Sequence, residues 1–257
     1  MSSPFDITHL RRLGDAVPQA GGGTKDPSPC GACSVRHLTL CAPLEQQELS
    51  EVSRIVTSVE LDPGEALFDE GEEAPYVYSV TAGAMKLYKL LPDGRRQVTG
   101  FLYAGDFLGL AAHDVYAYSA EAVTHAMLCR FPRKRLEELL ERFPKMERRL
   151  LGMAGHELVA AQEQMLLLGR KTAKEKIASF LLTLSRRAAQ RGQPENPVSL
   201  PMSRNDIGDY LGLTTETVSR SFTLLKTSGA ITLKPGGKVE LSDRDRLEEL
   251  AERARGA

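Results

Sequence analysis

The stretch that decides the fold is Ser203-Arg-Asn-Asp-Ile-Gly-Asp-Tyr-Leu-Gly-Leu-Thr-Thr-Glu-Thr-Val-Ser-Arg220. Ser203 can cap a first helix, with Asp206 three residues later as an acidic variant of the capping box. Gly212 breaks that helix, and Thr214 can cap a second one. Two short helices joined by a turn that contains glycine are typical of a helix-turn-helix, whose second helix enters the major groove of DNA.

The second helix, expected from Thr215 to about residue 227, has one polar face near its N-terminus. Glu216, Ser219 and Arg220 fall at positions i, i+3 and i+4 of this helix. Arginine can grip guanine with two hydrogen bonds, glutamate can accept one from cytosine, and serine can contact either base. The candidate DNA-contacting residues are therefore Thr215, Glu216, Ser219 and Arg220, while the opposite face (Val218, Phe222, Leu225) is expected to pack inward. Residues 230–241 follow as two strands around a Pro-Gly-Gly turn, which predicts a wing.

The distribution of charge agrees with a DNA-binding C-terminal part. Residues 170–240 hold twelve Lys and Arg against six Asp and Glu, whereas the rest of the chain holds 21 against 28. A basic module on an acidic body is the electrostatic footprint of a nucleic-acid-binding protein. The chain has no apolar run long enough to cross a bilayer and no apolar core for a signal peptide, so we expect a cytoplasmic protein without a membrane partner.

Residues 60–131 have a different texture, in which short β-rich segments such as 76–81 and 85–90 alternate with turn signals. Strands at a spacing of about ten residues predict a small antiparallel barrel or roll. Before it, apolar residues at helical spacing predict a short amphipathic helix over 43–59. Residues 1–29 are expected to be disordered.

A long helix is expected from about residue 144 to 168. Along it an apolar residue recurs at alternating spacings of three and four, which makes an a/d heptad seam: Leu151, Ala154, Leu158, Ala161, Met165 and Leu168. A narrow stripe suits one partner helix better than a broad core, so it favours a parallel homodimer over a helix packed only on its own domain. A further helix is expected over 172–190, a loop over 192–197, and a charged, weakly helical tail over 244–255.

Residues 206–220 resemble the helix-turn-helix of the Crp/Fnr regulators, and the likeness extends through 166–176 and 184–187 to the roll. The resemblance implies an α+β fold with a cyclic-nucleotide-binding-like β-roll, a dimerisation helix and a winged helix-turn-helix. The boundaries expected are a tail (1–29), a sensor with a cysteine loop and the roll (30–140), the dimerisation helix (141–169) and the DNA-binding domain (170–257). In the Fnr branch, residues matching Glu216, Ser219 and Arg220 read a TTGA half-site, which implies an operator like TTGAT-N4-ATCAA.

A cyclic nucleotide is not expected as the ligand of this roll. The cyclic phosphate normally meets an arginine shortly after a Gly-Glu pair, but the matching turn is Gly105-Asp106-Phe-Leu-Gly109 and no Arg or Lys lies between Gly109 and Ala122. A buried phosphate without a positive partner would be costly. The loop at 92–100 resembles the region that contacts RNA polymerase in these regulators.

All four cysteines are candidate metal ligands: Cys30, Cys33, Cys41 and Cys129. Disulfides are rare in cytosolic proteins, which favours metal binding or redox chemistry. Three closely spaced thiols with a remote fourth suit a [4Fe–4S] cluster with one cysteine per iron, but the spacing alone leaves zinc and unrelated thiols open.

The family resemblance narrows these alternatives. Oxygen-sensing Fnr proteins hold a [4Fe–4S] cluster through an N-terminal cysteine group and one cysteine in the roll, a place that Cys129 matches. The C-x2-C-x7-C spacing, with Arg36-His37 in the loop, is similar to the alphaproteobacterial FnrL, FnrN and FixK-like subgroup. The resemblance therefore implies an oxygen- or redox-responsive transcription activator of anaerobic genes.

The sequence leaves other sensor chemistries open. The sensor could instead be a zinc site, a thiol redox switch, or a haem held by His37 or His113. The Fnr oxygen sensors that the chain resembles can place an acidic residue in the middle of the seam, where Ala161 stands here. Dimerisation could therefore depend less on the cluster.

An enzyme is not expected, because no Gly-rich phosphate loop, nucleophile elbow or His-Glu zinc motif occurs.

Overall fold

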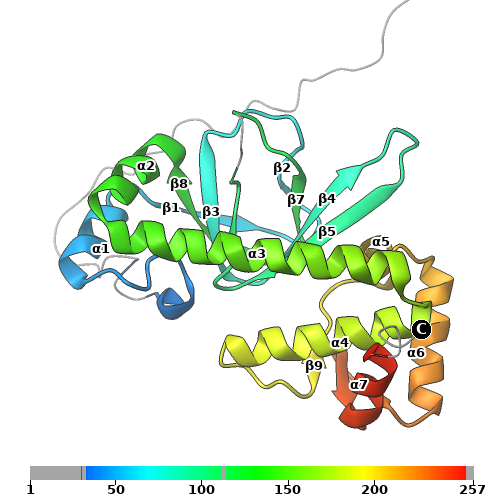
Figure 1. The fold of residues 1–257 in the computed structure, drawn as a ribbon. Coiled ribbons are helices and arrows are strands. Elements are labelled where there is room, and N and C mark those ends of the chain that lie inside the picture. The colour runs from blue at the N-terminus through cyan, green and yellow to red at the C-terminus, as the bar shows by residue number, and fades with distance from the viewer. Residues whose placement is uncertain (1–29, 31–32, 111–113, 253–257) are drawn as a thin grey trace, which may run out of the picture.

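The computed structural model describes residue 30, residues 33–110 and residues 114–252. The tail expected to be disordered (1–29), the end of the charged tail (253–257) and His113 lie outside these ranges. In Figure 1 a β-roll makes up the upper part of the molecule and a mostly helical C-terminal domain the lower part, and the long helix α3, Pro144–Arg170, runs along both. No described helix is both long and apolar enough to span a membrane.

The N-terminal segment forms a short 3-10 helix, Arg36–Leu38, and the helix α1, Gln46–Ser53. The helix expected over 43–59 is therefore too long. The chain then forms strand β1, Thr57–Leu61, which pairs with strand β8, Ala126–Pro132. The apolar residues after α1 are β-branched, and such residues favour the pleated surface of a sheet over a helix. Periodicity over so short a window did not separate the helix from the strand that follows it.

The roll consists of two four-stranded sheets, with strand orders β1-β8-β3-β6 and β2-β7-β4-β5. Its further strands are β2 Ala66–Phe68, β3 Tyr76–Ala82, β4 Ala84–Leu90, β5 Arg96–Tyr103, β6 Phe107–Leu108, β7 Ser119–Ala122 and β8 Ala126–Pro132. Aromatic rings fill the interior between the sheets, where Phe68 stacks on Tyr116 with ring centroids 3.6 Å apart. The expected roll over 60–131 is confirmed.

Two helices follow the roll, α2 at Arg133–Arg142 and α3 at Pro144–Arg170. The sequence did not predict α2, whereas α3 matches the long helix expected over 144–168. Near the start of α3, Met146 is fully buried in a cluster with side chains of α1, α2 and the outer face of the β1-β8-β3-β6 sheet. This anchor fixes one end of the helix to the N-terminal segment.

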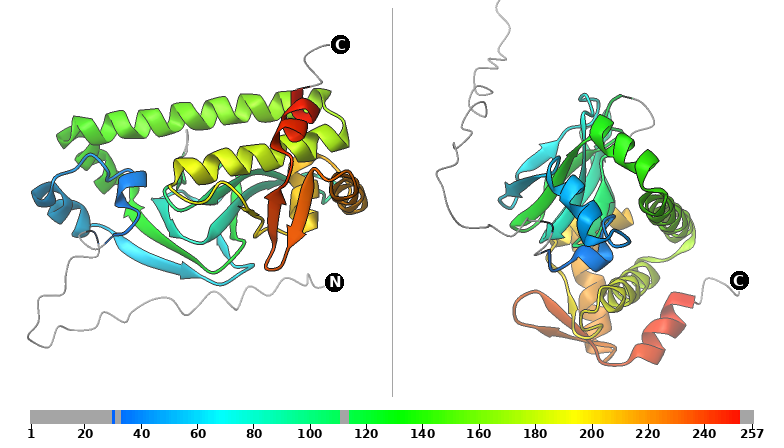
Figure 2. Two further views of the ribbon diagram at one scale, coloured as in Figure 1. Left: turned by 90° about the horizontal axis from the view of Figure 1, so that it is seen from below. Right: turned by 90° about the vertical axis from the view of Figure 1, so that its left-hand side faces the viewer.

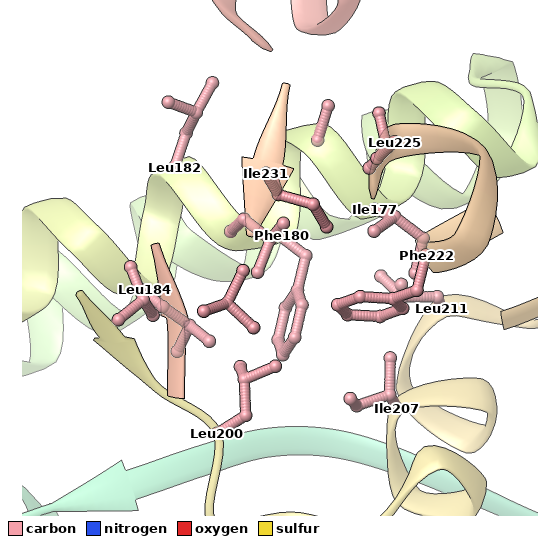
Figure 3. Packing of buried hydrophobic residues seen from close by; sticks show 14 of the residues in the cluster. Ile177, Phe180, Leu182, Leu184, Leu200, Ile207, Leu211, Phe222, Leu225 and Ile231 are labelled. Atoms are coloured by element: carbon pink, nitrogen blue, oxygen red, sulfur yellow. The ribbon is translucent and has the colours of Figure 1, made fainter. Parts of the chain in front are cut away.

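The C-terminal domain contains α4 Ala173–Gln190, β9 Val198–Ser199, α5 Arg204–Leu211, α6 Thr215–Thr227, β10 Ile231–Lys234, β11 Lys238–Leu241 and α7 Arg244–Glu252. Its core gathers side chains from every layer, among them Ile177, Ile207, Phe222 and Ile231 (Figure 3). Strands β10 and β11 pair around Pro235-Gly-Gly and so form the expected wing. The inward face predicted for α6 is confirmed, because Val218, Phe222 and Leu225 are buried.

Ion pairs and aromatic rings join the roll to the C-terminal domain. Lys86 of β4 is 5 % exposed, and its Nζ lies 2.7 Å from Glu121 Oε1 and 2.9 Å from Asp206 Oδ1 of α5. Arg96 of β5 bridges Asp206 at 2.9 Å and Asp209 at 3.1 Å. Phe101 of the roll packs beside Phe180 and Tyr210 of the C-terminal domain, with ring centroids 5.2–6.2 Å apart.

The turn between α5 and α6 depends on Gly208. A Cβ at this position would lie 2.6 Å from the carbonyl oxygen of Leu213, which is main chain and cannot rotate away. Gly212, which ends α5, has φ +62° and so adopts the left-handed conformation expected of a glycine cap. The sequence identified Gly212 as the break but gave no reason for Gly208.

We expect Gly208→Ala to lower the free energy of unfolding by about 1–3 kcal/mol, because the helix-turn-helix must open to accept the methyl group. Urea denaturation followed by circular dichroism at fixed protein concentration measures this change. The control is Gly152→Ala, since a Cβ at that exposed position of α3 meets no atom within 4 Å. Equal stability of the two variants would contradict the steric role of Gly208.

Candidate metal centre and nucleic-acid interface

The four cysteines line one cavity of about 50 Å³ between the N-terminal segment and the outer face of the roll. Cys30, Cys33 and Cys41 come from the loop around the 3-10 helix, and Cys129 lies in β8. Alternation along β8 explains the place of Cys129, because Leu128 points into the roll interior while Cys129 and Phe131 face the N-terminal segment. The fold thus brings together all four residues that the sequence singled out.

Burial dominates the chemistry of these thiols. Cys30 is buried, the other three are half-buried, and all four are free of disulfides. Burial, reinforced by the neighbouring thiols, raises the pKa of Cys41 to about 12 and that of Cys129 to about 11. The thiolate is the form that binds metal. A compensating cation in the cavity would therefore be needed to hold these groups deprotonated together.

The loop that carries Cys30, Cys33 and Cys41 is tied to the rest of the chain by two arginines. Arg36 lines the cavity and donates a hydrogen bond to the carbonyl of Leu44. Arg149 reaches over from α3, and its Nη2 donates to the carbonyl oxygen of Leu38 at 2.8 Å. The position of the cysteine loop and the position of α3 are thereby linked.

The sequence offered His37 and His113 as alternative haem ligands. His37 is exposed in the 3-10 helix and is absent from the residues that line the cavity. His113 lies outside the described residues. Over the described ranges, no group of three or more Cys, His, Asp and Glu side chains stands close enough to hold a single metal ion.

The sequence missed the hydroxyl groups around the cysteines. Ser58 of β1 and Ser79 of β3 both lie directly opposite Cys129 in the sheet and line the same cavity. Thr57 and Thr81 lie nearby on the same two strands and line it as well. Strand pairing decides which residues flank Cys129, and register is not visible in a single sequence, so no sequence signal pointed to these residues.

The candidate DNA-contacting residues share the solvent face of α6. Thr215, Glu216, Ser219 and Arg220 are all exposed. Arg220 forms an ion pair with Glu216 one turn away, and both side chains remain exposed on the outer face. Thr215 Oγ1 donates to Asn205 Oδ1 at 3.1 Å and so links α6 to α5. The capping of both helices agrees with the sequence, since Ser203 accepts from the amide of Asp206 and Thr214 accepts from that of Thr217.

The seam expected along α3 is largely exposed. Leu151, Leu158 and Met165 are 65 %, 61 % and 69 % exposed, and both alanines of the seam are exposed as well. Leu168 differs, because it packs against the core of the C-terminal domain. Val159 and Leu166, which the seam did not include, broaden the exposed apolar stripe. Figure 2 shows α3 along the outer side of the molecule, where a second subunit has access.

Comparison with known proteins agrees with both halves of the chain. The model of the cyclic nucleotide-binding domain matches residues 58–143, and that of the Crp-like helix-turn-helix domain matches residues 175–250. The transcriptional activatory protein AadR of Rhodopseudomonas palustris is 45 % identical over 85 % of this chain and 91 % of its own length. The transcriptional activator protein FnrL of Cereibacter sphaeroides is 40 % identical over 86 % of this chain and 91 % of its own length.

Among solved structures, that of FixK2 from Bradyrhizobium japonicum superposes with a TM-score of 0.71 at 41 % identity. The match covers 76 % of this chain and 97 % of FixK2. The expected α+β architecture of β-roll, long helix and C-terminal helix-turn-helix is confirmed. This chain belongs to the Crp/Fnr family of transcription regulators, among the FnrL- and FixK-like activators.

Proposed function

We propose that this protein is an oxygen- or redox-responsive transcription activator that holds a [4Fe–4S] cluster on Cys30, Cys33, Cys41 and Cys129. As a homodimer it binds a palindrome like TTGAT-N4-ATCAA and controls anaerobic or microaerobic genes in the cytoplasm, without enzymatic activity. The observation that carries the proposal is the convergence of four thiols from two distant parts of the chain on one cavity. The names of AadR and FnrL, which are activators, support the regulatory part.

The donor set suits a four-iron cluster better than a single ion. Zinc needs four ligands at about 2.0–2.3 Å from one point, whereas a cube takes one thiolate at each of its irons and so spreads its ligands apart. The cysteines line a common cavity without any three of the described ligand-type side chains closing on one point. When bound, such a cluster supplies a centre that oxygen can oxidise and degrade.

The chain itself connects the cysteine loop to dimerisation. Arg149 holds the carbonyl of Leu38 in the loop, and Met146, one turn earlier in α3, is buried with Cys30 in the same cluster of side chains. The exposed stripe begins two residues after Arg149, at Leu151. An ordered loop therefore fixes the start of α3 in one position, and we infer that this position favours pairing of the stripe with a second subunit.

Pairing along α3 would place two recognition helices on one DNA duplex. The two subunits of a dimer read half-sites one helical turn apart, so operator affinity depends steeply on dimerisation.

The β4–β5 hairpin has two parts with different surroundings. Its tip, residues 92–95, is exposed and free to contact RNA polymerase, whereas Arg96 and Gln97 bind α5.

The first test is composition. Protein purified without air is expected to show visible charge-transfer absorbance and roughly four irons and four sulfides per chain. Replacing any one of Cys30, Cys33, Cys41 or Cys129 with serine should remove most of both, because one iron then loses its only protein ligand and the cluster becomes unstable. His37→Ala is the control and should keep the cluster. Zinc in place of iron, or iron lost with His37→Ala, would replace the proposal by a zinc or a haem sensor.

The second test concerns the seam. Ala161 and its neighbour Ala160 are both exposed, but only Ala161 lies on the a/d stripe. Glutamate at position 161 would face its own copy across a dimer axis, so Ala161→Glu should weaken dimerisation by about tenfold or more, or ~1.4 kcal/mol. Sedimentation equilibrium of the anaerobic protein measures this. Ala160→Glu is the matched control, and equal weakening by both variants would place the interface elsewhere.

The third test concerns base readout. Arg220→Ala should cost ~1–3 kcal/mol on the TTGAT-N4-ATCAA operator and relax specificity at one base pair. Its affinity for random duplex should change little, since the loss is that of a base contact. Fluorescence anisotropy on both duplexes at one salt concentration measures the difference. Arg186→Ala removes an exposed arginine from α4 instead, and operator-specific loss with this variant rather than with Arg220→Ala would refute the assignment.

A further inference from the structure

The wall of the cysteine cavity contains one polar atom without a partner. Ser79 of β3 is 2 % exposed, and its Oγ has no hydrogen-bond partner among the described residues. A buried hydroxyl with no partner is unfavourable, and native structures rarely keep one without a ligand, ion or water to satisfy it. Since Ser79 lines the cavity of the four cysteines, the partner it lacks is to be sought there.

Strand register gives this hydroxyl its position. Ser79 lies directly opposite Cys129 on the neighbouring strand β8. Directly opposite residues of an antiparallel pair project from the same face of the sheet, with Cβ atoms about 4.5–5.5 Å apart. The hydroxyl of Ser79 and the thiol of Cys129 therefore belong to one row of side chains at the floor of the cavity.

The other hydroxyls of the cavity wall differ from Ser79. Thr81 Oγ1 donates to the carbonyl oxygen of Met127 at 2.9 Å, and Thr57 Oγ1 accepts from Arg130 Nε at 3.1 Å. Thr39, which is also buried, donates through its Oγ1 to the carbonyl oxygen of Arg36 at 2.9 Å. Ser58, on the far side of Cys129, is exposed, so water can satisfy it. Within the described part of the wall, Ser79 is thus the buried hydroxyl whose donor capacity is not used by the protein itself.

We propose that Ser79 is a positioning residue of the cysteine centre, whose hydroxyl donates a hydrogen bond to a sulfur atom beside Cys129 once the centre is loaded. This inference rests on the proposed [4Fe–4S] cluster and goes beyond it by naming a residue that tunes it. Hydrogen bonds to the sulfurs are among the determinants of the reduction potential of an iron–sulfur cluster. Such a bond stabilises the more negative, reduced form, so its loss shifts the potential downward.

The test compares four variants after anaerobic reconstitution. Ser79→Thr and Ser79→Val have the same shape and differ only in the hydroxyl, Ser79→Ala removes it without added volume, and Thr81→Val removes a hydroxyl that already has a partner. Redox titration should give a lower potential for Ser79→Ala and Ser79→Val than for wild type and Ser79→Thr. A tenfold change in the oxidised-to-reduced ratio corresponds to about 59 mV for one electron. Thr81→Val should leave the potential unchanged.

A second readout does not require the cluster. In the protein without iron the hydroxyl of Ser79 is unsatisfied, so Ser79→Ala should leave the unfolding midpoint in urea unchanged or raise it. In the loaded protein the same substitution should lower the midpoint. A structural role, or a bound water, would instead destabilise the iron-free protein. This comparison decides the question even if one variant assembles its cluster poorly.

The outcomes separate this inference from the proposed function. Wild-type protein without iron would overturn both. Wild-type protein with a full cluster, together with equal potentials for Ser79→Thr and Ser79→Val, would overturn the role of Ser79 alone. Equal shifts from Thr81→Val and Ser79→Val would also overturn it, because they would trace the effect to packing of the cavity wall.

Discussion

A single helix, α3, packs on the cysteine loop, carries the exposed apolar stripe and enters the core of the C-terminal domain. At 27 residues it is about 40 Å long, and its ends serve different parts of the chain. Its first turns are buried with the cysteine loop through Met146, and its last turns enter the core of the C-terminal domain through Leu167. The middle carries the exposed apolar stripe. A rigid element held at both ends transmits a displacement of one end to the other, so the positions of the cysteine loop, the stripe and the C-terminal domain depend on one another.

The contact between Lys86 and Asp206 gives the two domains a fixed orientation. A buried ion pair contributes little net stability, because desolvation offsets most of its Coulomb attraction, but leaving one partner alone is costly. Asp206 also accepts from the amide of Ser203 and so caps α5. One carboxylate therefore joins the start of the helix-turn-helix to the roll. Its pKa is lowered by hydrogen bonds from Ser203 and Lys86, which outweigh the opposing effect of burial, so it stays charged at neutral pH.

The sequence predicted features that depend on local chemistry. The caps at Ser203 and Thr214, the break at Gly212, the wing and the inward face of α6 each follow from a few adjacent residues, and all are present. Features set by contacts between distant residues were not predictable. Asp206 was recognised as a cap but not as the partner of Lys86, 120 positions away. The same holds for Ser79, whose place beside Cys129 is fixed by strand register, and for Leu168, which follows the heptad pattern but packs on its own chain.

The strength of the hydrogen bonds between the cysteine loop and α3 bears on how the proposed sensor would work. No acidic residue stands on the a/d positions of α3, so repulsion between acidic residues at those positions is not what the proposed cluster would have to overcome. In the proposed sensor the control would then act at the start of the helix, where Arg149 donates to the carbonyls of Leu38 and Thr39. A hydrogen bond from a charged donor contributes about 1.5–3 kcal/mol, and 1.4 kcal/mol is a tenfold change in an equilibrium. Loss of contacts of this size would change the proposed dimerisation by up to about tenfold, provided that they form only in the arrangement that pairs. In this proposal the chain would regulate through the order of one loop rather than through charge on the a/d positions of its interface.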